Sequence, residues 1–230
     1  MKRGVVIVAG GKGLRMGTAV PKQFLLLAGR PVLMHTIEVF HNFDAEMQII
    51  VVLPSEQQDF WRELCEKHQF NLSHEVISGG ETRFHSVKNG LSLVGGGVIV
   101  GIHDGVRPLV SSEVLSACYE MAEKQQAAFP VIPVIDSLRK RTQEGSIIVN
   151  RSEYLQVQTP QVFHSDLIKK AYMRPFSEQF TDDVSVFESM GGKAVEVPGC
   201  SKNIKITGEI DLVIAEEMIK TQYHGKFSNS

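Results

Sequence analysis

The chain has 230 residues, 43% hydrophobic and 22% charged, which is the composition of a globular protein able to bury the core of a single domain. Its formal net charge of −2 provides no general positive field, so we expect neither a nucleic-acid partner nor binding to an anionic membrane. No stretch approaches the roughly 18 apolar residues that a membrane span requires. Cys65, Cys118 and Cys200 are far apart and form no CxxC pair, which argues against a disulfide framework or a thiolate zinc site and predicts a cytoplasmic location.

Short apolar strands alternate with amphipathic helices along most of the chain. We expect strands at residues 5–8, 48–53, 75–77, 98–103, 128–134 and 193–197, and helices at residues 31–40, 55–68, 82–93, 113–125 and 166–172, with further helices starting at Thr181 and Thr207. This alternation predicts a single α/β domain over residues 1–230, with a wound, mostly parallel sheet and helices on both faces, as in Rossmann-like folds.

A glycine-rich loop follows the first strand. Glycines expose backbone N–H groups to a ligand because they have no Cβ, and Gly10 and Gly11 are followed by the cations of Arg15 and Lys22. The loop therefore predicts a grip on a polyphosphate. It is neither a P-loop, which needs Ser or Thr after its Gly-Lys pair, nor a dinucleotide fingerprint, which needs a third glycine where Met16 stands. The loop alone leaves open a glycine-rich turn with two solvated basic residues.

Other loops that follow predicted strands also carry polar or charged sequence. In a parallel sheet the carboxyl ends of the strands meet at one edge, where ligands bind. The loops at residues 10–22, 79–86 and 104–108 all fall at that edge. Lys205 stands among β-branched neighbours just before a helix, which favours a fixed position in a site over one in solvent. We therefore expect a ligand site at this edge of the sheet.

The alternation breaks at residues 136–160, where we expect a hairpin around Glu144 and Gly145. A hairpin of this length has little core of its own and needs a surface to pack on. We interpret it as a protruding β-arm that grips a second subunit of a homodimer. A plain surface excursion is the alternative.

Six motifs occur in order and at compatible spacing between Val5 and about Ile219. They are GKGLRM (residues 11–16), PKQF (21–24), GGETR (79–83), HDGVRP (103–108), QTPQVF (158–163) and NIK (203–205). Together they closely resemble the 2-C-methyl-D-erythritol 4-phosphate cytidylyltransferase family. The resemblance implies a nucleotidyltransferase that moves CMP from CTP to the phosphate of methylerythritol phosphate, with Mg²⁺, as a homodimer in the non-mevalonate isoprenoid pathway.

The resemblance also implies roles for individual residues. Arg15 and Lys22 would stabilise the transition state, while Arg151, from the arm of the other subunit, and Lys205 would position the sugar phosphate. The nucleotide would be held by Ala9, Gly10, Gly11, Gly80, Glu81, Ser86 and Asp104, and the polyol phosphate by Asp104, Arg107, Ser137, Thr159 and Thr181. Mg²⁺ would be held mainly by the CTP phosphates, without metal ligands from the chain. For Asp104 the alternative is an aspartate that only forms the turn before a glycine.

Three other functions compete with this one. Ribitol 5-phosphate cytidylyltransferase shares the Gly-Gly pair of residues 10–11, whereas the Asn-Arg-Ser segment at residues 150–152 favours the methylerythritol phosphate family. A nicotinamide-dependent oxidoreductase would need a ribose-binding acid after the second strand, where Pro54 and Ser55 stand instead. A regulatory module without catalysis would not need the basic residues named above.

Overall fold

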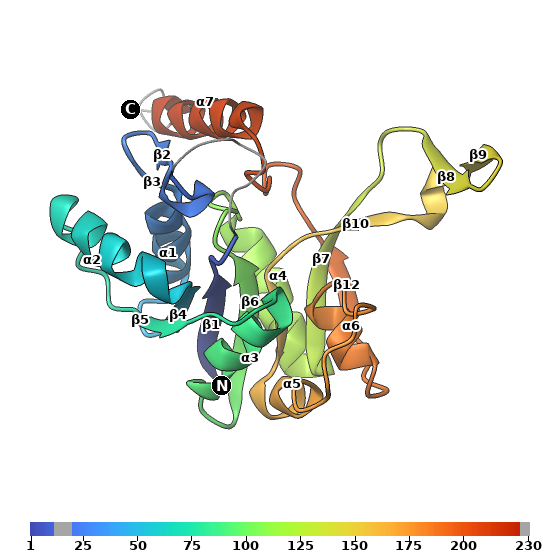
Figure 1. Ribbon diagram of the computed structural model, residues 1–230, viewed down its shortest axis with the longest axis horizontal. Helices are drawn as coiled ribbons and strands as arrows, with labels where there is room; N and C mark the ends of the chain where they lie inside the picture. The colour runs from blue at the N-terminus through green and yellow to red at the C-terminus, as the bar shows by residue number, and fades with distance from the viewer. Residues whose placement is uncertain (12–19, 226–230) are drawn as a thin grey trace.

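The structure is a computed structural model that describes residues 1–11 and 20–225, and in this part of the chain eight strands form the central sheet (Figure 1). Along the sheet the strands are ordered β10-β7-β11-β6-β1-β4-β5, and β12 also pairs with β7. Their bounds are β1 (Lys2–Val8), β4 (Gln48–Leu53), β5 (Glu75–Ser78), β6 (Val98–Asp104), β7 (Ala127–Pro133), β10 (Leu155–Val157), β11 (Gln161–His164) and β12 (Val195–Pro198).

Most of these strands run in one direction. β1, β4, β5 and β6 pair in parallel, as do β7 and β12, whereas β11 is antiparallel to both β6 and β7, and β10 is antiparallel to β7. The predicted wound, mostly parallel α/β sheet is therefore confirmed. Neither β10 nor β11 is among the predicted strands, because both are short and Pro160 interrupts the sequence between them.

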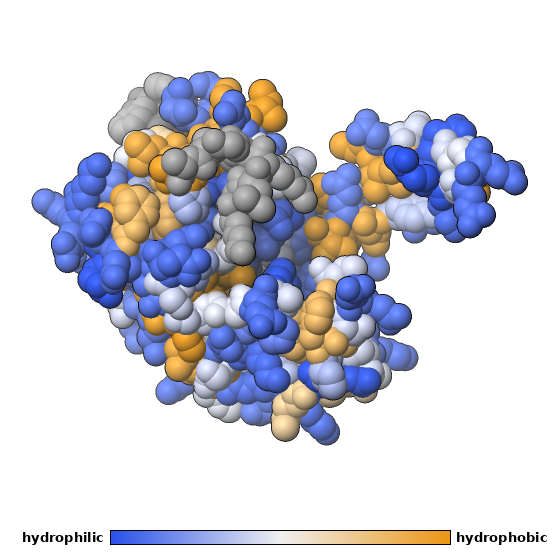
Figure 2. Space-filling view, viewed as in Figure 1, coloured by the Kyte–Doolittle hydropathy of each residue, from blue (hydrophilic) through white to orange (hydrophobic). Residues whose placement is uncertain are grey.

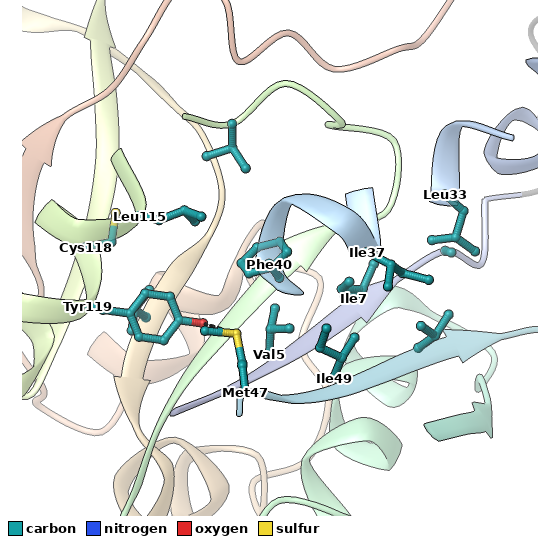
Figure 3. Packing of buried hydrophobic residues seen from close by; sticks show 14 of the residues in the cluster. Val5, Ile7, Leu33, Ile37, Phe40, Met47, Ile49, Leu115, Cys118 and Tyr119 are labelled. Carbon is teal, nitrogen blue, oxygen red and sulfur yellow. Dashed lines mark hydrogen bonds between the residues drawn. The ribbon is translucent and has the colours of Figure 1, made fainter. Parts of the chain in front are cut away.

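Helices cover both faces of the sheet. Their bounds are α1 (Val32–Phe43), α2 (Gln58–Lys67), α3 (Arg83–Ser92), α4 (Ser112–Gln125), α5 (Ser165–Ala171), α6 (Asp183–Glu188) and α7 (Glu209–Gly225). Val5 and Ile7 of β1 lie in one core with α1 and α4 (Figure 3), whereas Val6 lies in a second core with α3 and α5. Successive side chains of a strand point to opposite faces, so a strand that is apolar at every position needs a helical layer on each side. In the described residues, no helix combines the length and apolarity needed to cross a membrane.

Helix α3 lies very close to the sheet at Gly90. A Cβ at this position would meet Val6 Cγ1 at 2.4 Å and Val52 Cγ2 at 2.9 Å, both shorter than van der Waals contact. Because glycine has no side chain, α3 can pack this closely against β1 and β4. This distance matters for the ligand site because α3 starts at the carboxyl edge of the sheet.

Helices α2, α6 and α7 start two or three residues later than the sequence predicts, and local hydrogen bonds explain the first two. The segment after Pro54 first forms a 3-10 turn, Ser55–Gln57, because the Ser55 hydroxyl bonds to the Ser78 hydroxyl at 3.2 Å instead of capping a helix. Helix α6 starts at Asp183, where the Asp182 carboxylate caps it by accepting a hydrogen bond from the Ser185 N–H at 2.8 Å. Helix boundaries of this kind depend on local hydrogen bonds that spacing alone does not reveal.

A hairpin of β8 (Leu138–Thr142) and β9 (Gly145–Val149) stands away from the body of the protein (Figure 1). Hydrophobic surface gathers on this arm and at its root (Figure 2), where the exposed large side chains are Ile135, Ile147, Ile148, Tyr154, Leu155 and Val157. The protruding part is shorter than the expected range 136–160, because Leu155–Val157 pairs with β7 in the main sheet. A hairpin of two short strands has little core of its own and leaves Ile147 and Ile148 in solvent, and Leu155 and Val157 of β10 are exposed at the root of the arm.

Candidate active site

A cavity of about 660 Å³ opens at the carboxyl ends of β1, β4, β5 and β6. Its position follows from the parallel strands, whose carboxyl ends gather the loops after each strand at one edge. Nine of the predicted site residues line it: Ala9, Gly10, Gly11, Lys22, Gly80, Glu81, Ser86, Asp104 and Lys205. Residues separated by nearly 200 positions in the sequence therefore meet in one cavity.

Three cations surround the carboxylate of Asp104, the last residue of β6. Its Oδ2 lies 3.1 Å from Lys205 Nζ and 3.1 Å from Arg107 Nε, and its Oδ1 lies 3.9 Å from Arg83 Nε. Burial opposes ionisation of the carboxyl group, but the positive charges of Lys205, Arg83 and Arg107 outweigh it and hold the pKa of Asp104 well below its usual range. Asp104 is therefore ionised and orients Lys205 at the wall of the cavity.

A chain of hydrogen bonds holds Asp104 from inside the protein. The buried His103 has Nε2 3.0 Å from the carbonyl oxygen of Arg107, which can only accept, so Nε2 carries a proton. Burial lowers the pKa of His103 to about 4, so the ring is neutral at pH 7 and its Nδ1 accepts. The Thr159 hydroxyl consequently donates to Nδ1 at 3.0 Å and accepts from the Asp104 N–H at 3.1 Å. The hydroxyl proton of Thr159 is thus donated to His103 and is not available to a ligand.

The turn after β5 forms another wall of the cavity. The Ser86 hydroxyl accepts a hydrogen bond from the Gly80 N–H at 3.1 Å, and Thr82 caps α3 by accepting from the His85 N–H. A Cβ at Gly80 would lie 2.4 Å from His85 Cβ, so a larger residue would push the turn away from the helix. The turn can therefore approach a ligand closely with its backbone.

Lys22 also lines this cavity. It starts a 3-10 turn, Lys22–Phe24, and its ammonium group donates to the carbonyl oxygen of Thr207 at 2.5 Å. Lys205, two residues before Thr207, lines the same cavity. Two ammonium groups in the lining of one cavity create a positive environment suited to a phosphorylated ligand.

Arg107, Thr159, Ser137 and Arg151 do not line this cavity in the single chain. Arg107 and Thr159 support Asp104 from behind, as described above. Ser137 and Arg151 lie on the exposed arm, where the Arg151 guanidinium donates to the carbonyl oxygen of Ile135.

The remaining predicted site residues are Thr181 and Arg15. Thr181 lines a smaller pocket of about 210 Å³, which shares Thr82 and Arg83 with the main cavity. Arg15 lies outside the described residues.

The sequence analysis gives no role to Arg83, Tyr172 or Asp183. Arg83 lines the cavity and makes a two-pronged ion pair with Asp183, whose carboxylate also accepts a hydrogen bond from the Tyr172 hydroxyl at 2.6 Å. A signal for Arg83 exists, because it completes the GGETR motif. Asp183 carries no comparable signal, since an aspartate in the first turn of a helix is common for electrostatic reasons alone.

Among the described residues no group of three or more His, Cys, Asp or Glu side chains could hold a metal ion. The carboxylate of Asp104, which lines the cavity, is already surrounded by cations. The described residues of the cavity therefore do not fit a resident metal site.

A wound α/β sheet with glycine turns and lysines at its carboxyl edge is typical of enzymes that bind nucleotides and other phosphorylated ligands. The family model for 2-C-methyl-D-erythritol 4-phosphate cytidylyltransferase (IspD) matches residues 4–221. The chain belongs to this family. Membership rules out the nicotinamide-dependent oxidoreductase considered from the fold pattern.

Curated relatives agree over almost the whole chain. A protein named 2-C-methyl-D-erythritol 4-phosphate cytidylyltransferase from Bacteroides fragilis is 57% identical over 219 residues, which cover 95% of this chain and 100% of that protein. A protein of the same name from Porphyromonas gingivalis is 50% identical and covers 95% of this chain and 98% of its own length.

Solved structures share the fold. The crystal structure of the Thermus thermophilus 2-C-methyl-D-erythritol 4-phosphate cytidylyltransferase superposes with a TM-score of 0.78 at 29% identity, covering 96% of this chain and 100% of that chain. The corresponding enzyme from Francisella tularensis gives a TM-score of 0.78 at 28% identity, covering 94% and 99% of the two chains. The bifunctional IspDF from Campylobacter jejuni also matches, covering 93% of this chain and 54% of that longer chain.

Proposed function

We propose that the chain transfers CMP from CTP to 2-C-methyl-D-erythritol 4-phosphate, giving 4-diphosphocytidyl-2-C-methyl-D-erythritol and pyrophosphate in the non-mevalonate isoprenoid pathway. The observation that carries this proposal is the cavity at the carboxyl edge of the sheet, where the family's glycine turns meet Lys22 and Lys205. The relatives carry the name of this activity, and the match covers 98% to 100% of their length. A cytoplasmic location is part of the proposal, because the three cysteines are unpaired.

The chemistry needs positive charge and correct geometry more than a protein nucleophile. An oxygen of the acceptor phosphate attacks the α-phosphorus of CTP, a new P–O bond forms, and the bond to the β-phosphate oxygen breaks with its electron pair leaving on pyrophosphate. Lys22 and Arg15 stabilise the negative charge that develops, and Lys205 positions the acceptor phosphate. A unit charge about 4 Å from another contributes on the order of 4 kcal/mol at an effective dielectric constant near 20.

The nucleotide lies against the two glycine-bearing turns. Backbone groups at residues 9–11 and at Gly80, with Glu81 and Ser86, hold the base and ribose of CTP, and close backbone approach disfavours a larger purine. Mg²⁺ enters as part of the substrate, bound to the CTP phosphates and water. Asp104, already held by Thr159 and Lys205, faces both ligands.

The arm completes the site in a homodimer. Ser137 and Arg151 are exposed on the arm of one protomer and do not line that protomer's own cavity, and Ile147 and Ile148 offer apolar surface for a second chain. We expect Arg151 of the partner subunit to position the acceptor phosphate, with Ser137 and Thr181 near the polyol. Light scattering should give the mass of two chains at working concentration, and a monomer that is fully active would contradict the shared site.

The deciding experiment measures pyrophosphate release by the purified protein with CTP and Mg²⁺. Methylerythritol phosphate and ribitol 5-phosphate are compared as acceptors, because the Gly-Gly pair at residues 10–11 also fits the second enzyme. Release with methylerythritol phosphate alone supports the proposal, and release with ribitol 5-phosphate alone refutes the assignment of the acceptor. ATP serves as the control nucleotide, and equal turnover with ATP would refute the cytidine pocket.

A further inference from the structure

Arg83 lines the cavity, but its guanidinium is held by Asp183, a residue that does not line the cavity. It is the first residue of α3, directly after the turn that contains Gly80 and Glu81. Both of its terminal nitrogens donate to Asp183, at 2.7 Å to Oδ1 and 2.6 Å to Oδ2. This parallel pair of charge-assisted bonds fixes the plane of the guanidinium as well as its place.

Asp183 is itself held firmly. Its side chain has no exposed surface, and the Tyr172 hydroxyl donates to its Oδ1 at 2.6 Å. The ring of Tyr172 stacks on Phe84, the residue after Arg83, with ring centroids 4.6 Å apart. Bonds to a buried carboxylate are not weakened by competing water, so Asp183 holds Arg83 in a rigid position. We call the group of Arg83, Asp183 and Tyr172 the anchor.

The anchor links two parts of the cavity that the sequence keeps apart. With its terminal nitrogens on Asp183, Arg83 lies with Nε 3.9 Å from Asp104 Oδ1, and its backbone continues the β5 turn. Without Asp183 the guanidinium would be free to turn toward Asp104 or into the space of the nucleotide phosphates. The turn before α3 would lose its attachment to α6 at the same time.

We propose that Asp183 is a positioning residue of the nucleotide site: through its two-pronged bond to Arg83 it fixes the turn of Gly80 and Glu81 and keeps the terminal nitrogens of Arg83 away from Asp104, which then contacts only Nε. This inference rests on the proposed cytidylyl transfer. It assigns a functional role to a buried residue of α6 that does not line the main cavity.

The test combines two neutral substitutions. Asp183→Asn and Arg83→Gln each should lower kcat/KM for CTP by about 10- to 100-fold, since a displacement near 1 Å costs up to about 100-fold. The loss should appear chiefly as a higher KM for CTP, with the KM for the acceptor changed less, because the displaced turn faces the nucleotide. The double variant should match the more impaired single variant, since Asp183 acts only through Arg83.

Asp182→Asn is the matched control. Asp182 stands next to Asp183, caps α6 and accepts from Gln161 Nε2 at 2.9 Å, but it does not bond to Arg83. The same chemical change at this position should leave both KM values at their wild-type level. Calorimetric titration with CTP and Mg²⁺ adds a readout without turnover, and Asp183→Asn should weaken binding by the same factor as it raises KM.

Several results would overturn the inference. A folded Asp183→Asn variant with a wild-type KM for CTP would do so, as would losses that multiply in the double variant. If Asp183→Asn does not fold, Arg83→Lys decides, because it keeps the charge and loses the fork; a wild-type KM for CTP would then refute the role. A wild-type protein that releases no pyrophosphate would refute the proposed function. The calorimetric comparison of Asp183→Asn with Asp182→Asn measures CTP binding and needs no turnover, so it tests the role of Asp183 separately.

Discussion

Replacing Asp104 by asparagine should destabilise the protein strongly, although the two side chains have nearly the same shape. The substitution leaves Lys205, Arg107 and Arg83 facing one another around a neutral amide. At an effective dielectric constant near 20, each contact of 3.1 Å contributes about 5 kcal/mol of attraction, and the contact of 3.9 Å about 4 kcal/mol.

These gross attractions are partly offset by the cost of removing the charges from water. The Lys205 side chain is 45% exposed, so its share is further reduced by solvent screening. Breaking a buried ion pair by removing one partner costs about 3 to 5 kcal/mol, and we expect a loss in this range for Asp104→Asn. A loss of that size is a large part of the roughly 5 to 15 kcal/mol that stabilises a typical domain.

Urea unfolding at one fixed protein concentration measures this loss. Trp61, the single tryptophan of the chain, is buried and reports unfolding of the core by its fluorescence. The control is Asp59→Asn, which removes an exposed ion pair with Arg62 and should change the free energy of unfolding by less than about 0.5 kcal/mol. If Asp104→Asn stays within about 1 kcal/mol of the wild type, the three cations do not depend on this carboxylate and the reasoning fails.

Three further outcomes test other parts of the molecule. Lys22→Ala should lower kcat by at least about 100-fold in the pyrophosphate assay with an unchanged fold, and near-normal turnover would exclude its proposed role. Gly90→Ala should lower the free energy of unfolding by about 1 to 3 kcal/mol, because its Cβ would overlap Val6; an unchanged urea midpoint would show that α3 shifts freely. The pKa of His103 is about 6.5 in the unfolded chain and about 4 in the folded protein, so the unfolded state binds the proton more tightly. The stabilisation by the neutral His103 is therefore fully present above pH 6.5, and the free energy of unfolding should fall by about 3 kcal/mol as the pH is lowered to 4. His103→Gln should flatten this pH dependence in the same urea assay, and an identical slope in both proteins would contradict the assignment.

The sequence predicts the layers of the fold because β1, β4 and β6 are continuous apolar runs of strand length. Such runs occur where helices cover both faces of a sheet, and the parallel direction then places the following loops at one edge. This reasoning brings Ala9, Lys22 and Asp104 into one cavity without any structural information. The apolar pattern of the strands and the geometry of a parallel sheet are sufficient to predict this part of the site.

The remaining features depend on contacts that have no local signature. The ion pair between Arg83 and Asp183 joins residues 100 positions apart. Arg83 belongs to the GGETR motif, but nothing in the sequence around Asp183 marks it as the partner of Arg83. β11 is a four-residue strand whose place between β6 and β7 follows from pairing, not from its composition. Ser137 and Arg151 lie on the arm and do not line the cavity, and in the proposed homodimer they would reach the site of the second chain.

The insertion of β11 between β6 and β7 has a consequence for how the protein is made. Ribosomes add about 5 to 20 residues per second, so β1, β4, β5 and β6 leave the ribosome several seconds before Gln161 does. During that interval one edge of β6, a strand buried along its whole length in the finished protein, lacks its partner. An apolar strand with an open edge pairs readily with other chains. Slow translation of residues 105–164 should therefore increase aggregation of the nascent chain, and a chain released before Gln161 would lack the strand that closes the sheet beside its ligand cavity.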